Sequence, residues 1–424
     1  METYVAALNY AIPFFISLIV VEKLAASIMK KEVIRGMDTL SSLSSGLTNV
    51  IKDVLGLTVT ILSYEWMVEH LAVWQVSSSW LVVVLAFIGL DFAGYWVHRI
   101  SHQVNYFWNH HLIHHSSEEF NLGCALRQSI SDWFSLTFIF LLPIALLGVP
   151  ARVVALIAPI HLFMQFWYHT RLIGRMGLLE KILVTPSHHR VHHAINKEYL
   201  DKNLSQVFIV WDHLFGTFQE ELADVPCVYG VKRPVRTWNP IIINFLHLWQ
   251  LIRDAWHAQR YVDKVRIWFM PTGWRPADVV ARYPVEVIED VYRQQKYAPS
   301  ASWALQGWSW LQYVVNFAFM MLLFNHLSQM VFGEMVAYGA FLFLSVYSFT
   351  MLMDRSPASG WVELMKSVLG LTVIVRTGDW LYVGDRWPAG VYAVGAYFVL
   401  SALVVLYFSR MDRGGRSAIL SEPV

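Results

Sequence analysis

The sequence predicts an all-α, polytopic integral membrane protein with a cytoplasmic, histidine-rich di-metal site capped by amphipathic helices. Composition supports the membrane assignment, because 56% of the residues are hydrophobic, 15% are aromatic and the mean hydropathy is +0.43. The distribution of histidine supports the metal site, because twelve of the 17 histidines fall between His98 and His193. Many of them are three or four residues apart, so a helix would present them on one face.

Nine segments are apolar enough to be candidate membrane spans, given that a crossing helix needs about 20 largely apolar residues. They lie near 4–21, 54–72, 79–97, 133–149, 151–168, 309–332, 335–353, 361–376 and 389–409. Several are short for a full crossing. The pair on either side of Pro150 could instead form a hairpin that dips into the bilayer from one side.

The N-terminal span is predicted to be a retained anchor, because the chain begins with acidic Glu2 and lacks the basic start of a signal peptide. Basic residues follow both the first and the last span, which predicts that both flanks are cytoplasmic. These residues are Lys23, Lys30, Lys31, Arg35 and Lys52, and then Arg410, Arg413 and Arg416. With nine spans, this orientation places the histidines and the segment 170–300 on the cytoplasmic side.

The polar stretch 221–307 carries charged residues between tryptophans such as Trp249 and Trp256. This pattern suits amphipathic helices that lie against the membrane or cap a site. A solvated cytoplasmic segment is an equally good interpretation. The stretch separates the N-terminal part of the chain from the apolar tail at 308–424.

Eight histidines at repeated spacings are the predicted metal ligands, because burying so many imidazoles without a metal would be costly. They are His98, His102, His111, His114, His115, His189, His192 and His193. His169 ends a candidate span and is a plausible ninth ligand, and His188 could substitute for His189. His161 is expected to be structural or to face the substrate. The other histidines, His110 included, are expected to be passive.

Other site classes find little support in the sequence. Two cysteines leave little room for a thiolate site or a disulfide framework, and the net charge of +1 gives no reason to expect nucleic acid. The glycine-rich, Walker, zincin and serine-hydrolase motifs are absent. Imidazole accepts zinc, copper, iron or nickel. A redox-active metal pair at a membrane surface, such as two ferrous ions, suits activation of dioxygen against an unactivated C–H bond.

Three motifs carry a family resemblance: His98-Arg-Ile-Ser-His102, His111-Leu-Ile-His114-His115 and Thr185-Pro-Ser-His-His-Arg-Val-His-His193. Together they resemble the histidine boxes of the fatty acid hydroxylase/sterol desaturase superfamily. The stretch Trp211-Asp-His-Leu-Phe-Gly-Thr217 is similar to the signature that follows the last box. Ser116-Ser-Glu-Glu-Phe-Asn121 and Ala125-Leu-Arg-Gln-Ser129 resemble the alkylglycerol monooxygenase branch and its bacterial members most.

The resemblance implies an O2-dependent, non-haem di-iron monooxygenase that hydroxylates a membrane lipid, in a bacterial inner membrane or the endoplasmic reticulum. For the closest branch it implies ether-lipid cleavage with a reduced pterin, and a ferredoxin or a cytochrome is the other possible electron donor. Gln103 stands where that branch commonly has Glu, and Asp201-Lys-Asn-Leu-Ser205 departs from its Asp-Lys-Asn-Tyr-Gly pattern. A sterol or fatty-acyl desaturase or hydroxylase, and a non-catalytic metal transporter or sensor, are the alternatives.

Composition and the resemblance together divide the chain into 1–78 as anchor spans, 79–220 as the catalytic core, 221–307 as the amphipathic segment and 308–424 as C-terminal spans with a basic tail. Asp91 and Asp201 are candidates to fix imidazole tautomers. A structural hydrogen bond between helices is an equally good interpretation of Asp91. Glu118 and Arg127 could orient polar headgroup atoms of the substrate. Asn203, in the departing motif, is a further candidate supporting residue.

Overall fold

The computed structural model is helical throughout the residues it describes, which are 2–56, 63–132 and 137–416. Those residues form no strand, only three isolated bridges. The first helices are α1 (Glu2–Ile28), α2 (Gly36–Val54), α3 (Tyr64–Leu71), α4 (Trp80–Gln103), α5 (Asn105–His115), α6 (Thr137–Leu146), α7 (Ala151–Phe166), α8 (Pro186–His192) and α9 (Val210–Phe215). They are followed by α10 (Pro240–His257), α11 (Tyr261–Arg266), α12 (Ala277–Arg282), α13 (Trp303–His326), α14 (Phe332–Met353), α15 (Ser359–Thr377), α16 (Val383–Arg386) and α17 (Gly390–Arg416). Short 3-10 helices are η1 (Cys124–Leu126), η2 (Gly177–Lys181), η3 (Val291–Arg293) and η4 (Leu327–Gln329).

Within the described residues, five helices are long and apolar enough to cross a membrane, rather than the nine expected. They are Tyr10–Ile28, Trp80–Gln103, Trp303–Gln329, Phe332–Met353 and Gly390–Arg410. The expected spans at 133–149 and 151–168 are the shorter helices α6 and α7, which at 1.5 Å per residue do not reach across a bilayer core. The pair therefore fits the hairpin alternative better than two crossings.

Two further expected spans also differ in the structure. Of the segment 54–72, residues 57–62 lie outside the described part, and the rest forms the short helix α3. The segment 361–376 lies in α15, which carries the buried Glu363 and Lys366 and so lacks the apolar character of a span. Lys366 Nζ lies 2.7 Å from Glu363 Oε1, which pairs the two charges inside the C-terminal helices.

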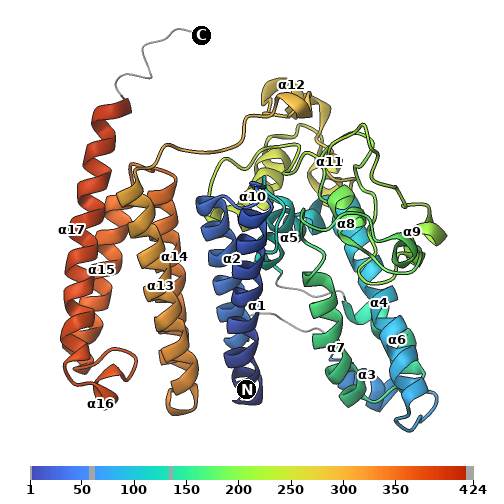
Figure 1. Cartoon of the computed structure of the whole chain (residues 1–424), viewed down its shortest axis with the longest axis horizontal. Coiled ribbons are helices and arrows are strands. Elements are labelled where there is room, and N and C mark those ends of the chain that lie inside the picture. Colours follow the sequence, from blue (N-terminus) through green and yellow to red (C-terminus); the bar gives the residue numbers. More distant parts are fainter. Residues whose placement is uncertain (1, 57–62, 133–136, 417–424) are drawn as a thin grey trace.

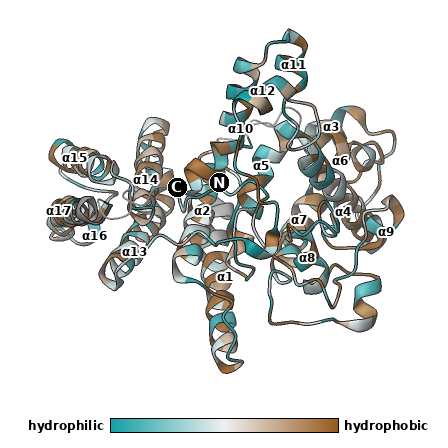
Figure 2. Cartoon of the chain, turned by 90° about the horizontal axis from the view of Figure 1, so that it is seen from above, coloured by the Kyte–Doolittle hydropathy of each residue, from teal (hydrophilic) through white to brown (hydrophobic). Residues whose placement is uncertain are grey.

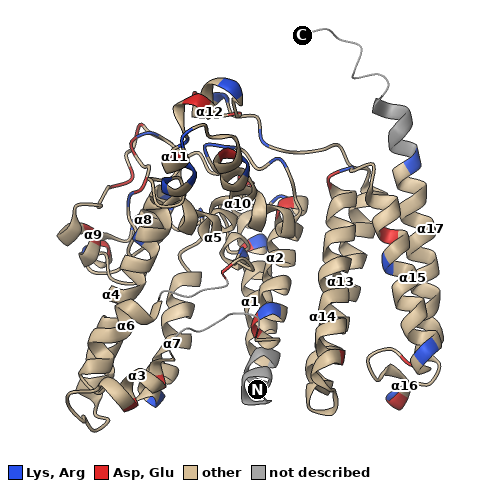
Figure 3. Ribbon diagram, turned by 180° about the vertical axis from the view of Figure 1, so that it is seen from behind, with Lys and Arg blue, Asp and Glu red and all other residues tan. Residues whose placement is uncertain are grey.

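The helices form two groups on either side of α1 and α2 (Figure 1). Seen from above, α13, α14, α15, α16 and α17 lie on one side, and α4, α6, α7, α8 and α9 lie on the other (Figure 2). Charged residues gather in the upper segments around α10 to α12, whereas α13 and α14 carry few (Figure 3). The stretch 221–307 thus lies over one end of the helices, which is one of the arrangements that its sequence allowed.

Helix α2 joins the two groups, and its apolar residues recur every three or four positions, as in an amphipathic helix. Its leucines and isoleucine pack into the largest apolar cluster together with α13 and α14; examples are Leu40, Leu47 and Ile51. Its other buried face is polar, with Asp38, Ser42 and Ser45 nearly or fully inaccessible to solvent. These polar groups bind the segment that follows the second histidine box, so α2 forms one wall of the site.

Helix α4 delivers the first histidines because its local signals fix both ends. The Ser79 hydroxyl accepts a hydrogen bond from Val82 N–H, which caps the start. The helix then runs for 24 residues, most of them apolar. At the other end Val104 N–H donates to Ile100 C=O, and the chain turns directly into α5. His98 and His102 therefore lie in the last two turns, facing the histidines of α5.

Candidate metal centre

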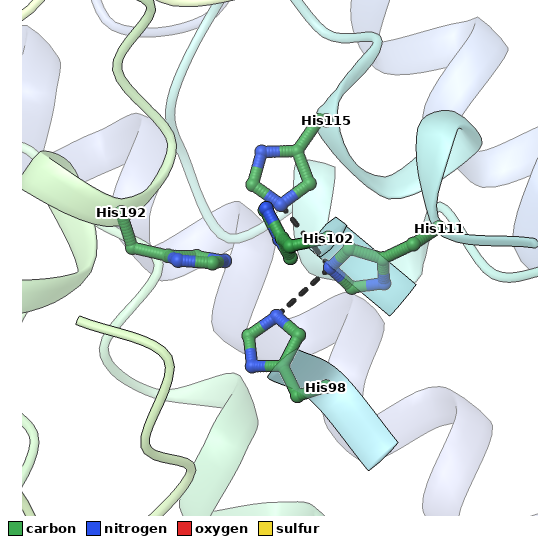
Figure 4. Close-up of side chains that lie close together, drawn as sticks. All are labelled: His98, His102, His111, His115 and His192. Atoms are coloured by element: carbon green, nitrogen blue, oxygen red, sulfur yellow. Dashed lines mark hydrogen bonds between the residues drawn. The ribbon is translucent and has the colours of Figure 1, made fainter. Parts of the chain in front are cut away.

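Nine histidines converge in two groups. The first holds His98 and His102 of α4, His111 and His115 of α5, and His192 of α8. The second holds His114 of α5, His169 just after α7, His189 of α8 and His193 at its end. Within each group one ring nitrogen per residue lies within 4.8 Å of every other. The first group points inward from three different helices (Figure 4).

Backbone carbonyls orient several of these rings. His98 Nδ1 lies 2.7 Å from Leu204 O, His192 Nδ1 lies 3.0 Å from Lys202 O, and His114 Nδ1 lies 3.3 Å from Arg127 O. A carbonyl oxygen only accepts, so each Nδ1 must carry the proton and donate it. The Nε2 lone pair of each ring is then free and directed toward its group, which is the arrangement that metal-binding histidines use.

The distances between Nε2 atoms fit a bound ion. His111 Nε2 lies 2.9 Å from His98 Nε2 and 3.1 Å from His115 Nε2. In the second group, His189 Nε2 lies 2.8 Å from His169 Nε2 and 3.0 Å from His193 Nε2. Two nitrogens bound at right angles to one ion at about 2.1 Å are about 3 Å apart.

Unpartnered nitrogens give an independent sign of metal ligation. Among the described residues, His102 Nε2 and His192 Nε2 are buried and have no hydrogen-bond partner. A buried polar atom without a partner costs stability unless something else satisfies it. Both atoms belong to the first group, where an ion would satisfy them.

Burial and mutual repulsion keep these imidazoles neutral. Burial lowers the pKa of His111, His115, His189 and His193 well below the usual value, and neighbouring histidines lower it further. The pKa of His114 falls to about 3 for the same two reasons. Neutral imidazole is the form that binds a metal, so the site holds its ligands ready.

The structure places the predicted ninth ligand, His169, in the second group. His188 lies outside both groups, because α8 turns its ring toward Thr185, with Nδ1 3.5 Å from Oγ1. His189 thus takes the position for which His188 was the alternative. His110 faces Asp132, 3.5 Å away, and His161 binds Asp91 at 2.8 Å.

Asp91 anchors a loop and contacts none of the nine histidines. Its carboxylate accepts from the backbone N–H groups of Val207 and Phe208 and from the Trp211 indole, besides His161. Asp201 does lie beside a predicted ligand, with Oδ1 3.2 Å from His102 Nδ1. This contact fits the tautomer-fixing role expected of Asp201.

Replacing Asp91 with asparagine is expected to destabilise the protein rather than empty the metal centre. The amide NH2 of the asparagine would face an N–H group that donates to the carboxylate in the wild type. Two donors would then face each other, at a cost of about 2 kcal/mol. Thermal unfolding in detergent should show a lower midpoint, with unchanged metal content per folded chain. A midpoint equal to that of the wild type, or selective loss of metal, would contradict this role.

Asn203, Glu118 and Arg127 make structural contacts. The Asn203 amide donates to His188 O at 3.0 Å and to Gln219 O at 2.8 Å, which ties α8 to the following segment. Glu118 accepts from Tyr297 N–H, on the side of the capping stretch. The Arg127 guanidinium binds Asp38, Ser42 and Ser116, and its own carbonyl accepts from His114.

The Trp-Asp-x-x-Phe-Gly-Thr segment holds the backbone of the loop whose Leu204 carbonyl binds His98. Asp212 accepts from Leu204 N–H at 2.7 Å, from Ser205 N–H at 2.9 Å and from the Thr217 hydroxyl at 2.7 Å. The carbonyl of that same Leu204 orients His98. Gly216 supplies the left-handed turn, at φ +74°, that brings Thr217 back to Asp212.

An Asp212→Asn variant is therefore expected to bind metal more weakly, by about tenfold, because Leu204 O would no longer be fixed opposite His98. Metal retained after dialysis against a graded chelator measures this. Asp224→Asn, at an exposed carboxylate, is the control and should match the wild type. Equal retention by the Asp212 variant would remove this residue from the support of the site.

A cavity of about 630 Å³ opens from the histidines into the helical part of the molecule. His98, His111, His114, His169 and His189 line one end. Apolar side chains line much of the rest: Ala11, Ile12, Phe15, Ile16, Leu47, Val50, Phe140, Leu162, Tyr313, Phe317 and Met320. Rings of α1 and α7 meet beside it, with the centroids of Phe15 and Phe166 4.6 Å apart. The shape and lining suit a molecule with a long apolar chain.

Sequence reasoning missed the groups that hold the ligands. Backbone carbonyls bind the rings, namely those of Leu204, Lys202 and Arg127. Every residue has a carbonyl, so the sequence does not show which ones take this role. The role of Asp212 had a signal in the resemblance, yet only the fold shows what that aspartate binds.

A helical membrane chain that gathers nine histidines in two groups at one end of a lipid-sized cavity defines a membrane metalloenzyme of the histidine-box class. Residues 83–217 match the fatty acid hydroxylase family model, an interval that contains all nine histidines. The chain belongs to the fatty acid hydroxylase family. It is an O2-dependent lipid monooxygenase, like the monooxygenases and hydroxylases to which it is similar.

Human alkylglycerol monooxygenase is 34% identical over 366 residues, covering 85% of this chain and 81% of the relative. The Danio rerio alkylglycerol monooxygenase is 32% identical over 93% of this chain and 87% of the relative. The ornithine lipid hydroxylase OlsE of Rhizobium tropici is 30% identical over 136 residues, covering 32% of this chain and 41% of that protein. No solved structure matches.

Proposed function

We propose that this chain is a di-iron monooxygenase that hydroxylates an ether lipid of the alkylglycerol type. The observation that carries the proposal is the position of two imidazole groups at the end of a cavity lined by apolar side chains. The printed names of the relatives, alkylglycerol monooxygenase and ornithine lipid hydroxylase, support hydroxylation of a lipid.

The two histidine groups would each hold one metal ion, through the Nε2 atoms that the backbone carbonyls leave free. Iron fits better than zinc because the reaction needs a redox metal. A bound di-iron pair supplies reductive activation of O2. The histidine side chains are buried, so little water reaches them. Their imidazoles are neutral, so no proton has to leave before a metal binds.

The overall chemistry balances with an external two-electron donor. One oxygen atom enters the C–H bond next to the ether oxygen, and the other leaves as water after two electrons and two protons are added. The product is a hemiacetal, which collapses to an aldehyde and glycerol. A reduced pterin is the proposed donor, with a ferredoxin or a cytochrome as the other candidates.

The protein contributes position to this reaction. The apolar lining holds the alkyl chain, so that its first carbon lies at the histidine end of the cavity. His169 and His189 flank this end together with His114. We place the site on the cytoplasmic side of the membrane, since basic residues follow the first and last spans.

Lipid products would test the substrate class. Membranes from cells that express the wild type should convert a ¹⁸O₂-exposed hexadecylglycerol to hexadecanal that carries label, when tetrahydropterin is supplied. Membranes with His193→Ala should not. Conversion of a sterol or a free fatty acid instead, with hexadecylglycerol untouched, would replace the ether-lipid proposal by the desaturase or hydroxylase alternative.

A further inference from the structure

A cluster of charged and polar side chains lines the cavity beside its histidine end and takes no part in holding the histidines. It consists of Asn49, Lys52 and Asp53 near the end of α2, His110 of α5, and Asp132. All five line the cavity. In Figure 1, α2 ends part-way down α1 and α13, so the end of α2 lies within the depth that the spanning helices occupy. Ionisable side chains at such a depth are costly and usually have a functional reason.

The cluster offers both donors and acceptors. The Lys52 ammonium, in a side chain only 10% exposed, lies 3.2 Å from Asp53 Oδ1 and donates to Ser129 O at 3.1 Å. Asn49 donates to the second oxygen of Asp53 at 3.1 Å. His110 Nδ1 lies 3.5 Å from Asp132 Oδ1, and the Asp132 side chain is 39% exposed. Asp132 therefore has acceptor capacity left over.

This cluster lies a short distance from the metal centre. His110 precedes the ligand His111 in α5. Lys52 binds Ser129 O, and His114 binds the carbonyl of Arg127, two residues earlier. Two residues of chain span at most about 7 Å. A small headgroup could therefore contact the cluster while the carbon attached to it reaches the histidines.

The charges favour a neutral headgroup. The cluster holds one ammonium group, which pairs with Asp53, and a second carboxylate, Asp132, so it has no excess positive charge to offer a phosphate. The other basic group that lines this part of the cavity, Arg127, is already paired with Asp38 at 2.7 Å. A hydroxyl group donates to a carboxylate and accepts from an ammonium, so it can use both kinds of partner.

We propose that Lys52, Asp53, His110 and Asp132 form a binding site for the uncharged, hydroxyl-bearing headgroup of the lipid, which fixes the reacting carbon at the histidines. The proposal rests on the ether-lipid function above and names the residues that select the headgroup. Asp132 and Lys52 are then specificity-determining residues. The alkyl chain would extend from the site between α1 and α13, along Phe15, Phe317 and Met320.

Equilibrium binding without turnover tests the proposal. Purified protein in detergent, kept anaerobic and without reductant, would be loaded with radiolabelled hexadecylglycerol. The label would be displaced by unlabelled hexadecylglycerol, by hexadecyl methyl ether, which lacks the hydroxyls, or by hexadecylglycerol 3-phosphate. In the wild type we expect the diol to compete at least about tenfold better than either analogue. The ether lacks the hydroxyls that hydrogen-bond to the charged groups, and the phosphate brings negative charge beside two carboxylates.

The variants assign this preference to residues. Asp132→Asn should weaken diol binding about tenfold and leave ether binding unchanged. Lys52→Met should have the same effect, because it removes the ammonium group that donates to the hydroxyls. Asp385→Asn, at an exposed carboxylate of α16, is the matched control and should behave as the wild type. Unfolding midpoints near that of the wild type would show that the variants are folded.

Equal competition by diol and ether in the wild type would overturn the proposal, and so would Asp132→Asn and Lys52→Met variants that keep the full diol preference. The outcome is separable from the proposed reaction. A diol preference that depends on Asp132, in a protein that never oxidises the bound lipid when loaded with iron and reductant, would sustain this site and refute the ether-lipid oxygenase.

Discussion

His111→Ala is expected to lower lipid oxidation by at least about a thousandfold and to remove metal from the first histidine group. His111 Nε2 lies about 3 Å from both His98 and His115, so its loss opens one edge of that group. Metal content and product formation, measured on the same purified sample, check this together. The second group shares no ligand with the first, so part of the metal should remain.

His188→Ala is the matched control, since His188 is a buried histidine of the last box that lies outside both groups. It should keep both its metal and most of its activity. Loss of metal in His188→Ala equal to that in His111→Ala would mean that α8 presents the other histidine of the pair to the metal. Full activity of His111→Ala would exclude the first group from the site.

Arg127→Met is expected to destabilise the protein by about 3 kcal/mol or more, because it leaves a buried carboxylate without its partner. The guanidinium is 1% exposed and binds Asp38 at 2.7 Å, Ser116 at 2.7 Å and Ser42 at 3.0 Å. Burial raises the pKa of Asp38, and the charge of Arg127 opposes that rise. Without Arg127 the carboxyl group must either stay charged and unpaired or take up a proton.

Thermal or denaturant unfolding in detergent measures this loss. Arg293→Met serves as the control, because that side chain is 88% exposed and its pairing with Asp290 should contribute little. A double variant, Arg127→Met with Asp38→Leu, should regain part of the stability by removing the unpaired charge. An Arg127→Met protein as stable as the wild type would mean that α2 is not held to the site by this pair.

Spacing along a helix explains why so much of the metal centre could be predicted from the sequence. The pairs His98 and His102, and His111 and His115, are four residues apart, so any helix puts each pair on one face. All eight predicted ligands are in the two groups, with His169 as the ninth. What spacing could not decide was how the boxes divide, because His114 joins a different group from its neighbour His115.

The parts that the sequence did not predict depend on tertiary contacts. The apolar runs near 133–149 and 151–168 form helices that end early, since Gly148 and Pro150 separate them. Helix α2 has a periodic apolar face, but that pattern does not show that its serines and Asp38 form one wall of the site. Asp91, expected beside an imidazole ligand, instead binds a loop that only the folded chain brings to α4.

Iron stoichiometry together with O2 consumption tests the central claim most directly. Purified wild-type protein from iron-replete cells, supplied with a reductant and hexadecylglycerol, should contain about two irons per chain and consume one O2 per aldehyde formed. Tightly bound zinc alone, with no O2 consumed with any reductant or lipid, would contradict the claim that the nine histidines form an oxygenase centre.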